Sequence, residues 1–172
     1  MPFIVTIPPQ PGGRGGAEVT VLGTHFNINA YENERTINTT LLQGSVRVQS
    51  TIDNKQLAIL KPGEQAIAVA SPLTPDSYRD HHSLLTIDHS PNVDQIMSWK
   101  NGLFNFEGAS LAEVMHQLER WYDIEVQYEP GVPKLEFVGK MGRDLSLNNV
   151  LRGLELSKVH FRLEGRKLTV LP

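Results

Sequence analysis

Between residues 19 and 60, apolar side chains recur at every second position in short runs. Successive side chains of a β-strand point to opposite faces of a sheet, so a period of two predicts strands with one buried face. Turn-forming residues separate the runs and limit each strand to about five residues, as in an all-β layer. The alternating residues are Val19 and Val21, Phe26, Ile28 and Ala30, Val46 and Val48, and Leu57 and Ile59. The separating residues are Gly23 with Thr24, residues 32–34, Gly44, and Asp53 with Asn54. This stretch therefore predicts a stack of short antiparallel strands.

Further strands are expected on both sides of this stretch. Residues 3–7 predict a strand that begins almost at the first residue, and the prolines and glycines of residues 8–16 predict a loop after it. Lys61-Pro62-Gly63-Glu64 has Pro and Gly at the positions that a type II turn requires, and residues 64–71 predict one more strand. Many short strands with regular turns are typical of a sandwich, a roll or a small β-solenoid, and the sequence does not choose among them. We expect an all-β domain over residues 1–72 that is truncated at its N-terminus.

An internal repeat marks the second half of the chain. Both copies place apolar residues at i, i+3, i+4 and i+7, which is one face of a helix, and both begin with a serine that can cap the first turn. The copies are Ser110-Leu111-x-x-Val114-Met115-x-x-Leu118 and, 36 residues later, Ser146-Leu147-x-x-Val150-Leu151-x-x-Leu154. Strands are expected around the helices at residues 103–106, 124–128, 136–139, 159–163 and 168–171. The pattern predicts an α+β chain whose residues 99–172 form a βαβ unit twice over, with a small sheet covered by two helices.

Residues 71–95 show no sustained periodicity and contain three prolines, so we expect a linker at residues 73–98. This region holds side chains of the types that bind zinc or iron. They are Asp80, His81, His82, Asp88 and His89. No HxxxH or HExxH spacing places two of them on one face, so we predict a solvated polar linker and no metal site. An enzyme that uses these histidines is the alternative.

Composition and missing motifs narrow the class of protein. The formal net charge of -3, with Lys and Arg scattered along the chain, argues against nucleic-acid binding. The absence of cysteine excludes disulfides and thiolate catalysis. The longest apolar run is residues 66–70, far below the roughly 18 residues that span a bilayer. The sequence has no phosphate loop, GxSxG or GxGxxG motif after a strand, so it predicts a binding module without a cofactor or catalytic residues rather than an enzyme.

Several segments, in the same order along the chain, together resemble one known family. In the first half these segments are PFIV at 2–5, VTVLGTHFNINAY at 19–31, LLQGSVRV at 41–48 and LKPGEQ at 60–65. In the second half they are residues 98–126, SWKNGLFNFEGASLAEVMHQLERWYDIEV, and FVGKM at 137–141. These segments resemble the periplasmic part of FecR-type anti-sigma regulators, the inner-membrane partners of TonB-dependent transducers, in the form common in Bacteroidetes. It implies that residues 99–172 are similar to the secretin and TonB short N-terminal fold.

The resemblance also implies a role in signal transduction and transcription regulation. In such regulators a cytoplasmic domain holds an extracytoplasmic-function sigma factor, one helix crosses the inner membrane, and the periplasmic part senses an occupied outer-membrane transporter. The chain is similar to the periplasmic part alone. It would therefore reach a sigma factor only through a missing cytoplasmic domain, and the membrane only through a missing transmembrane helix.

The mechanism expected from this resemblance is recognition without chemistry. The signalling domain of a TonB-dependent transporter would dock on the chain, and an open strand edge could take up an added strand from it. Candidate contact residues follow from the enrichment of aromatics and arginine at interfaces, although Trp121 at a helix end is also typical of a core position. They are Trp99, Phe104, Phe106, Arg120 and Trp121. The alternatives are a periplasmic module that binds a glycan or a small ligand, and a structural module of a secretion or pilus assembly.

Overall fold

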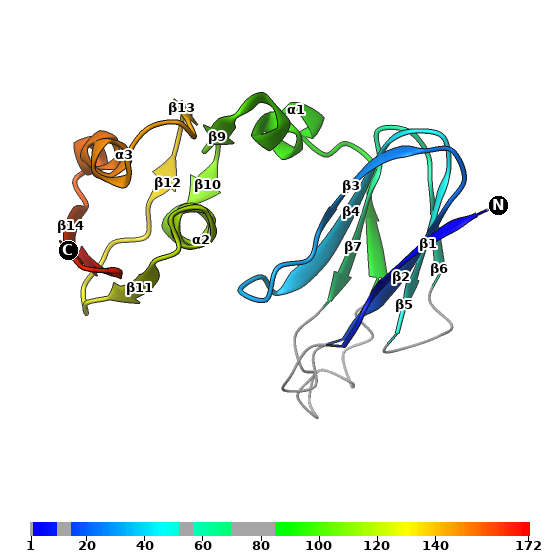
Figure 1. Cartoon of the computed structure of the whole chain (residues 1–172), viewed down its shortest axis with the longest axis horizontal. Coiled ribbons are helices and arrows are strands. Elements are labelled where there is room, and N and C mark those ends of the chain that lie inside the picture. The colour runs from blue at the N-terminus through cyan, green and yellow to red at the C-terminus, as the bar shows by residue number, and fades with distance from the viewer. Residues whose placement is uncertain (1, 10–14, 52–56, 70–84) are drawn as a thin grey trace. The chain divides into compact units, whose positions relative to one another are not determined.

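The computed structural model describes residues 2–9, 15–51, 57–69 and 85–172. The chain divides into two compact units, Met1–Val93 and Asp94–Pro172 (Figure 1). The boundary differs from the predicted linker at 73–98, because residues 85–98 are structured: Leu85–Asp88 form strand β8 and Val93–Ile96 form helix α1. A short strand between polar residues gives too weak a pattern to be recognised in a sequence. The predicted turn at Asp53 and Asn54, and the residues Asp80, His81 and His82, lie outside the described residues.

Unit 1 consists of two antiparallel sheets of four strands each (Figure 1). The first has the order β1-β2-β5-β6, with β1 at Phe3–Ile7, β2 at Ala17–Val21, β5 at Val46–Ser50 and β6 at Leu57–Leu60. The second has the order β3-β4-β7-β8, with β3 at His25–Asn29, β4 at Thr36–Gln43 and β7 at Gln65–Val69. One cluster of buried apolar side chains draws on both sheets, so the arrangement is a sandwich.

The alternating pattern correctly predicts the buried face of β2 and β5, where Val19 and Val48 lie opposite each other in the core. It is wrong for β6. Leu57 and Ile59 are exposed, whereas Ala58 and Leu60 are buried. All four residues of β6 are apolar, so alternation alone cannot choose its inner face. The register chooses it, because Ala58 pairs with the buried Val48, and directly opposed residues lie on the same face of a sheet.

Three glycines occupy the turns in which the chain crosses from one sheet to the other. Gly23 lies between β2 and β3, Gly44 between β4 and β5, and Gly63 between β6 and β7. Their φ angles are 61°, 94° and 87°, in the left-handed region that favours glycine. These are the glycines of the LGT, GSV and PGE segments, so this part of the family-like sequence specifies backbone geometry. The predicted type II turn is confirmed by the positive φ of Gly63 and by the bond from Glu64 N–H to the Lys61 carbonyl, 3.0 Å.

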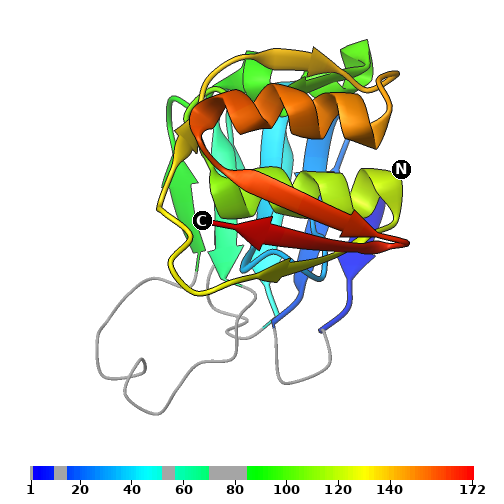
Figure 2. The ribbon, with the colours of Figure 1, turned by 90° about the vertical axis from the view of Figure 1, so that its left-hand side faces the viewer.

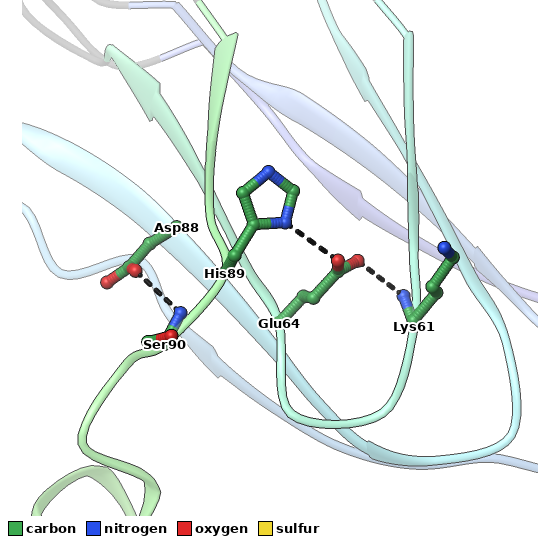
Figure 3. Close-up of polar contacts among 5 residues, drawn as sticks. All are labelled: Lys61, Glu64, Asp88, His89 and Ser90. Atoms are coloured by element: carbon green, nitrogen blue, oxygen red, sulfur yellow. Dashed lines mark hydrogen bonds and ion pairs between the residues drawn. The ribbon is translucent and has the colours of Figure 1, made fainter.

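Glu64 joins this turn to the end of β8 (Figure 3). One carboxylate oxygen accepts the Lys61 backbone N–H at 2.8 Å, and the other lies 2.8 Å from Nδ1 of His89. Asp88 instead accepts the backbone N–H of Ser90 at 2.9 Å. The bond from the Lys61 N–H, and then the bond with His89, hold the pKa of Glu64 below its ordinary value of 4.5. His89 and Asp88 therefore serve the local structure of unit 1.

We expect Glu64→Gln to change how the stability of unit 1 depends on pH. A carboxyl whose pKa is lowered by folding stabilises the fold above its unfolded pKa, and this contribution is lost as pH falls through the lower folded pKa. Wild type should therefore be more stable than Glu64→Gln at pH 6, and the two should converge as pH falls well below about 4.5. Urea unfolding followed by the amide NMR signals of unit 1 at a series of pH values measures this. Glu18→Gln, at an exposed position on β2, is the control. Parallel pH profiles for wild type and Glu64→Gln would contradict the assignment.

Unit 2 contains two main helices, α2 at Leu111–Tyr122 and α3 at Leu147–Leu154. Both appear end-on in Figure 1 and lengthwise in Figure 2, so their axes run roughly parallel. A three-stranded sheet has the order β11-β15-β14, with β11 at Glu125–Tyr128, β14 at His160–Glu164 and β15 at Lys167–Leu171. Two further strand pairs join β9 at Leu103–Asn105 to β13 at Lys140–Gly142, and β10 at Ala109–Ser110 to β12 at Glu136–Phe137. Two short 3-10 helices complete the unit, η1 at Ser98–Asn101 and η2 at Glu155–Ser157.

Both repeated helices are confirmed with their serine caps. Ser110 and Glu113 form a capping box, and the side chain of Ser146 accepts the Asn149 backbone N–H. The strand–helix–strand order is present twice, but β9 and β11 on the two sides of α2 belong to different sheets. The single sheet predicted from the sequence is therefore wrong, because periodicity identifies strands without identifying their partners. The likeness to the secretin and TonB short N-terminal fold stays a prediction.

Candidate partner-binding surface

The five contact residues predicted from the sequence separate into buried and accessible groups. Phe104 and Phe106 are 0% and 2% exposed, with ring centroids 5.6 Å apart. They are core residues and cannot touch a partner in this fold, so that part of the prediction is wrong. Trp99, in η1, is 50% exposed and Trp121, at the end of α2, is 49% exposed. Arg120, the residue before Trp121, is partly buried.

An arginine that the sequence analysis did not select lies beside Trp121. The guanidinium carbon of Arg143 lies 4.8 Å from the ring centroid of Trp121 and 4.8 Å from that of Phe104. This is the range of a cation–π interaction, which is worth about 0.5–2 kcal/mol depending on exposure. Arg143 is held at both ends, since its Nε donates to the Leu103 carbonyl at 3.2 Å and its backbone N–H donates to the Gly102 carbonyl at 2.8 Å.

The aromatic residues at the end of α2 are fixed to the loop between β13 and α3. Trp121 Nε1 donates to the Arg143 carbonyl at 3.0 Å, and the Tyr122 hydroxyl donates to the Leu145 carbonyl at 2.7 Å. The Trp121 ring also meets Phe104 edge-on, with centroids 6.1 Å apart. Burial, and then the nearby Asp144 carboxylate, raise the pKa of Tyr122, so its hydroxyl remains a donor at neutral pH.

We call Trp121, Tyr122 and Arg143 the Trp121–Arg143 surface. Its side chains come from two segments, and each makes a hydrogen bond or ring contact that fixes its position. The sequence-based expectation that Trp121 seals its helix is met only in part, because its ring contacts Phe104 while half of the side chain is exposed. Arg143 lies 22 residues after Trp121, within an ordinary Gly-Arg-Asp turn, so no local pattern distinguishes it.

A separate groove of about 850 Å³ lies between the start of α2, the end of β11 and the loop before β12. Its lining includes Leu111, Tyr128, Val132 and Leu135. At the start of α2, the backbone N–H of Ser110 is not available to a ligand, because it donates to the Glu113 carboxylate at 2.7 Å. Burial, and then Glu119, raise the pKa of Tyr128. The described lining also includes three charged residues, Glu129, Lys134 and Glu136.

Across the ranges that the structure describes, no group of three or more His, Asp or Glu side chains could hold a metal ion. Within the same ranges, no helix is long and apolar enough to cross a membrane.

Comparisons with known proteins agree with the resemblance seen in the sequence. Residues 103–170 match the family model described as FecR, C-terminal. Two crystal structures, each of a candidate anti-sigma factor from Parabacteroides distasonis ATCC 8503, share the fold with a TM-score of 0.68 and 24% sequence identity. They cover 90% of this chain, which in turn covers 66% and 67% of theirs. The chain thus spans slightly less than two thirds of the first of these structures. No curated protein gives a significant match.

Unit 2 is thus a small α+β domain. Most of it matches the FecR C-terminal family model, and the predicted resemblance of the chain to FecR-type anti-sigma factors is confirmed.

Proposed function

We propose that the chain is the periplasmic, signal-receiving part of an anti-sigma regulator of the inner membrane. In this proposal it binds the signalling domain of a TonB-dependent outer-membrane transporter. A cytoplasmic domain beyond this chain would pass the bound state to an extracytoplasmic-function sigma factor. The family match of unit 2 supports a regulatory role, and the Trp121–Arg143 surface supports binding of a protein.

The observation that carries the proposal is an exposed tryptophan whose position is fixed. Trp and Arg are the residues most enriched among those that dominate binding energy. Binding costs free energy for every side chain that it must immobilise, about 0.5–1.5 kcal/mol for a flexible one. Trp121 and Arg143 already hold each other through the indole N–H bond and the ring stack, so much of this cost is met in the free protein. The same contacts leave half of the Trp121 side chain available to a partner.

Trp99 and Arg120 remain proposed contacts at the margin of this surface. Arg120 precedes Trp121 on α2. Trp99 lies three residues before Gly102, and the Gly102 carbonyl accepts the Arg143 backbone N–H. Phe104 supports the surface from below through its contacts with Trp121 and Arg143.

Titration calorimetry against the signalling domain of the transporter encoded beside this protein tests the proposal. We expect one-to-one binding, and Trp121→Ala should weaken it by about 2 kcal/mol or more, roughly thirtyfold. Arg143→Lys keeps the charge but loses the planar guanidinium that stacks on the ring, so it should also weaken binding. Leu156→Ala is the control, because Leu156 is 87% exposed and lies on η2. Unchanged affinity in a folded Trp121→Ala variant would show that the partner does not bind at this surface.

The groove gives little support to the alternative of a glycan-binding module. Sugar rings stack on exposed aromatic side chains and need several polar partners. Tyr128 is the only aromatic residue among those that line the groove, so a second ring on which a sugar could stack is not present there. A protein partner is therefore the function that the described residues support best.

A further inference from the structure

The three-stranded sheet of unit 2 has two edges, and they differ. Its order is β11-β15-β14, so β11 and β14 each have one side that pairs with no other strand. An edge strand presents unpaired backbone groups that can accept another chain, unless something covers them.

The β11 edge is covered. The backbone N–H of Glu129 donates to the Val170 carbonyl of β15 at 2.9 Å. Backbone groups alternate in direction along a strand, so the N–H of Val126 points away from β15. It donates to Oε1 of Glu119, a side chain from α2, at 3.0 Å. A strand approaching β11 would have to displace this carboxylate.

The β14 edge is open at two residues. Glu164 and Lys167 close a two-residue turn, and the closing pair of such a hairpin exchanges both backbone hydrogen bonds. The pairing repeats at every second residue, so Arg162 with Thr169 is also bonded. The N–H and C=O groups of Phe161 and Leu163 therefore point outward. In the described part of the chain, neither residue has a hydrogen bond on this outer side.

We propose that the β14 edge binds an extended strand of a partner protein. The charges on the solvent-facing side define the strand that fits. Glu125, Lys167 and Glu164 lie side by side with alternating sign across the sheet. A basic residue in the added strand would continue this row opposite Glu164. An acidic residue would face Arg162, whose guanidinium also pairs with Glu129 at 3.2 Å. Apolar residues would lie opposite Phe161 and Leu163, extending the side of the sheet that packs on the helices.

A second copy of this chain fits the edge less well. Consider the antiparallel register that uses the outward backbone groups of both Phe161 and Leu163. In it, Phe161 of one copy would pair with Leu163 of the other, and the reverse. It would then place two Arg162 side chains directly opposite each other, and like charges at that position destabilise strand pairing. The occupant is therefore a different protein. This inference stands independently of which protein docks on the Trp121–Arg143 surface.

The probe is the peptide acetyl-Thr-Lys-Val-Glu-Val-Thr-amide, which has the required pattern in the antiparallel direction. We expect saturable shifts of the Phe161 and Leu163 amide signals when ¹⁵N-labelled protein is titrated with it. Leu163→Pro should weaken binding by about tenfold or more, because it removes an outward donor. The bonds of β14 to β15 do not use the Leu163 N–H, so the hairpin should persist. Leu163→Ala keeps that donor and loses only part of an apolar side chain, so it should weaken binding clearly less than Leu163→Pro does.

A second peptide tests the same backbone hydrogen bonds on the wild-type protein, so the result does not depend on whether Leu163→Pro folds. Acetyl-Thr-Lys-Pro-Glu-Pro-Thr-amide lacks the two donors that would pair with Phe161 and Leu163, and it should bind wild type at least about tenfold more weakly. Equal binding of both peptides, or shifts confined to residues outside β14, would overturn the proposal. Self-association without peptide that Leu163→Pro removes would also overturn it, because the occupant would then be a second copy.

Discussion

Phe104→Ala should destabilise unit 2 by about 3–5 kcal/mol, the usual cost of removing a fully buried phenylalanine ring. Phe104 is 0% exposed and contacts the rings of Phe106, Trp121 and Tyr122, as well as the Arg143 guanidinium. The cavity would lie directly beneath the Trp121–Arg143 surface. Because a domain of this size is typically stable by only about 5–15 kcal/mol, much of the variant should unfold at modest urea concentrations.

Urea unfolding followed by NMR measures this loss for each unit separately. The amide signals of Val150 report on the core of unit 2 and those of Val19 on the core of unit 1. Leu156→Ala removes a comparable apolar side chain from an 87% exposed position, so it should change stability by no more than about 0.5 kcal/mol. A similar small effect for Phe104→Ala would show that the ring is not part of the core.

Gly44→Ala should destabilise unit 1 by about 2–5 kcal/mol, through two separate effects. Its φ of 94° is unfavourable for any residue with a Cβ atom, at a cost of about 1–2 kcal/mol. The added Cβ would also lie 2.7 Å from the Thr24 side chain and 3.2 Å from the Gly23 carbonyl oxygen. Relieving such overpacking typically costs about 1–3 kcal/mol more. Thr24 and Gly23 belong to the neighbouring crossover, so the substitution would strain two of the three turns between the sheets.

Gly63→Ala separates the two effects. Gly63 has a similar φ of 87°, but a Cβ atom there would meet nothing within 4 Å. It should therefore show only the backbone cost, about 1–2 kcal/mol. Equal losses for the two variants, measured by urea unfolding of unit 1, would mean that the close approach of Gly44 to Thr24 has no energetic consequence.

Local features of the sequence predict much of this fold. Alternation identifies β2 and β5, and the serine with a helical repeat identifies α2 and α3, because these patterns depend on neighbours only a few residues apart. The turn at Lys61–Glu64 is specified equally locally, by a proline and a glycine at fixed positions. Each of these elements carries its own signal.

Features that depend on distant partners could not be predicted in this way. The inner face of β6 depends on its register with β5, and the pairing of β9 with β13 joins segments far apart in the chain. The candidate surface has the same property, because Arg143 is distinguished only by the folding of its loop onto Trp121. Phe104 and Phe106 are of a residue type that is common both in interfaces and in cores. Only their burial in the folded structure shows that they belong to the core.

An NMR titration of the two tryptophan indole signals tests the central claim most directly. The chain contains Trp99 and Trp121, so a ¹⁵N-labelled sample gives two side-chain indole signals. In the free protein, the Trp121 indole N–H donates to the Arg143 carbonyl. We predict that unlabelled transporter signalling domain shifts the Trp121 indole signal saturably, with the same affinity that calorimetry measures. Saturable binding that leaves the Trp121 signal unmoved would contradict the assignment of the Trp121–Arg143 surface as the binding site.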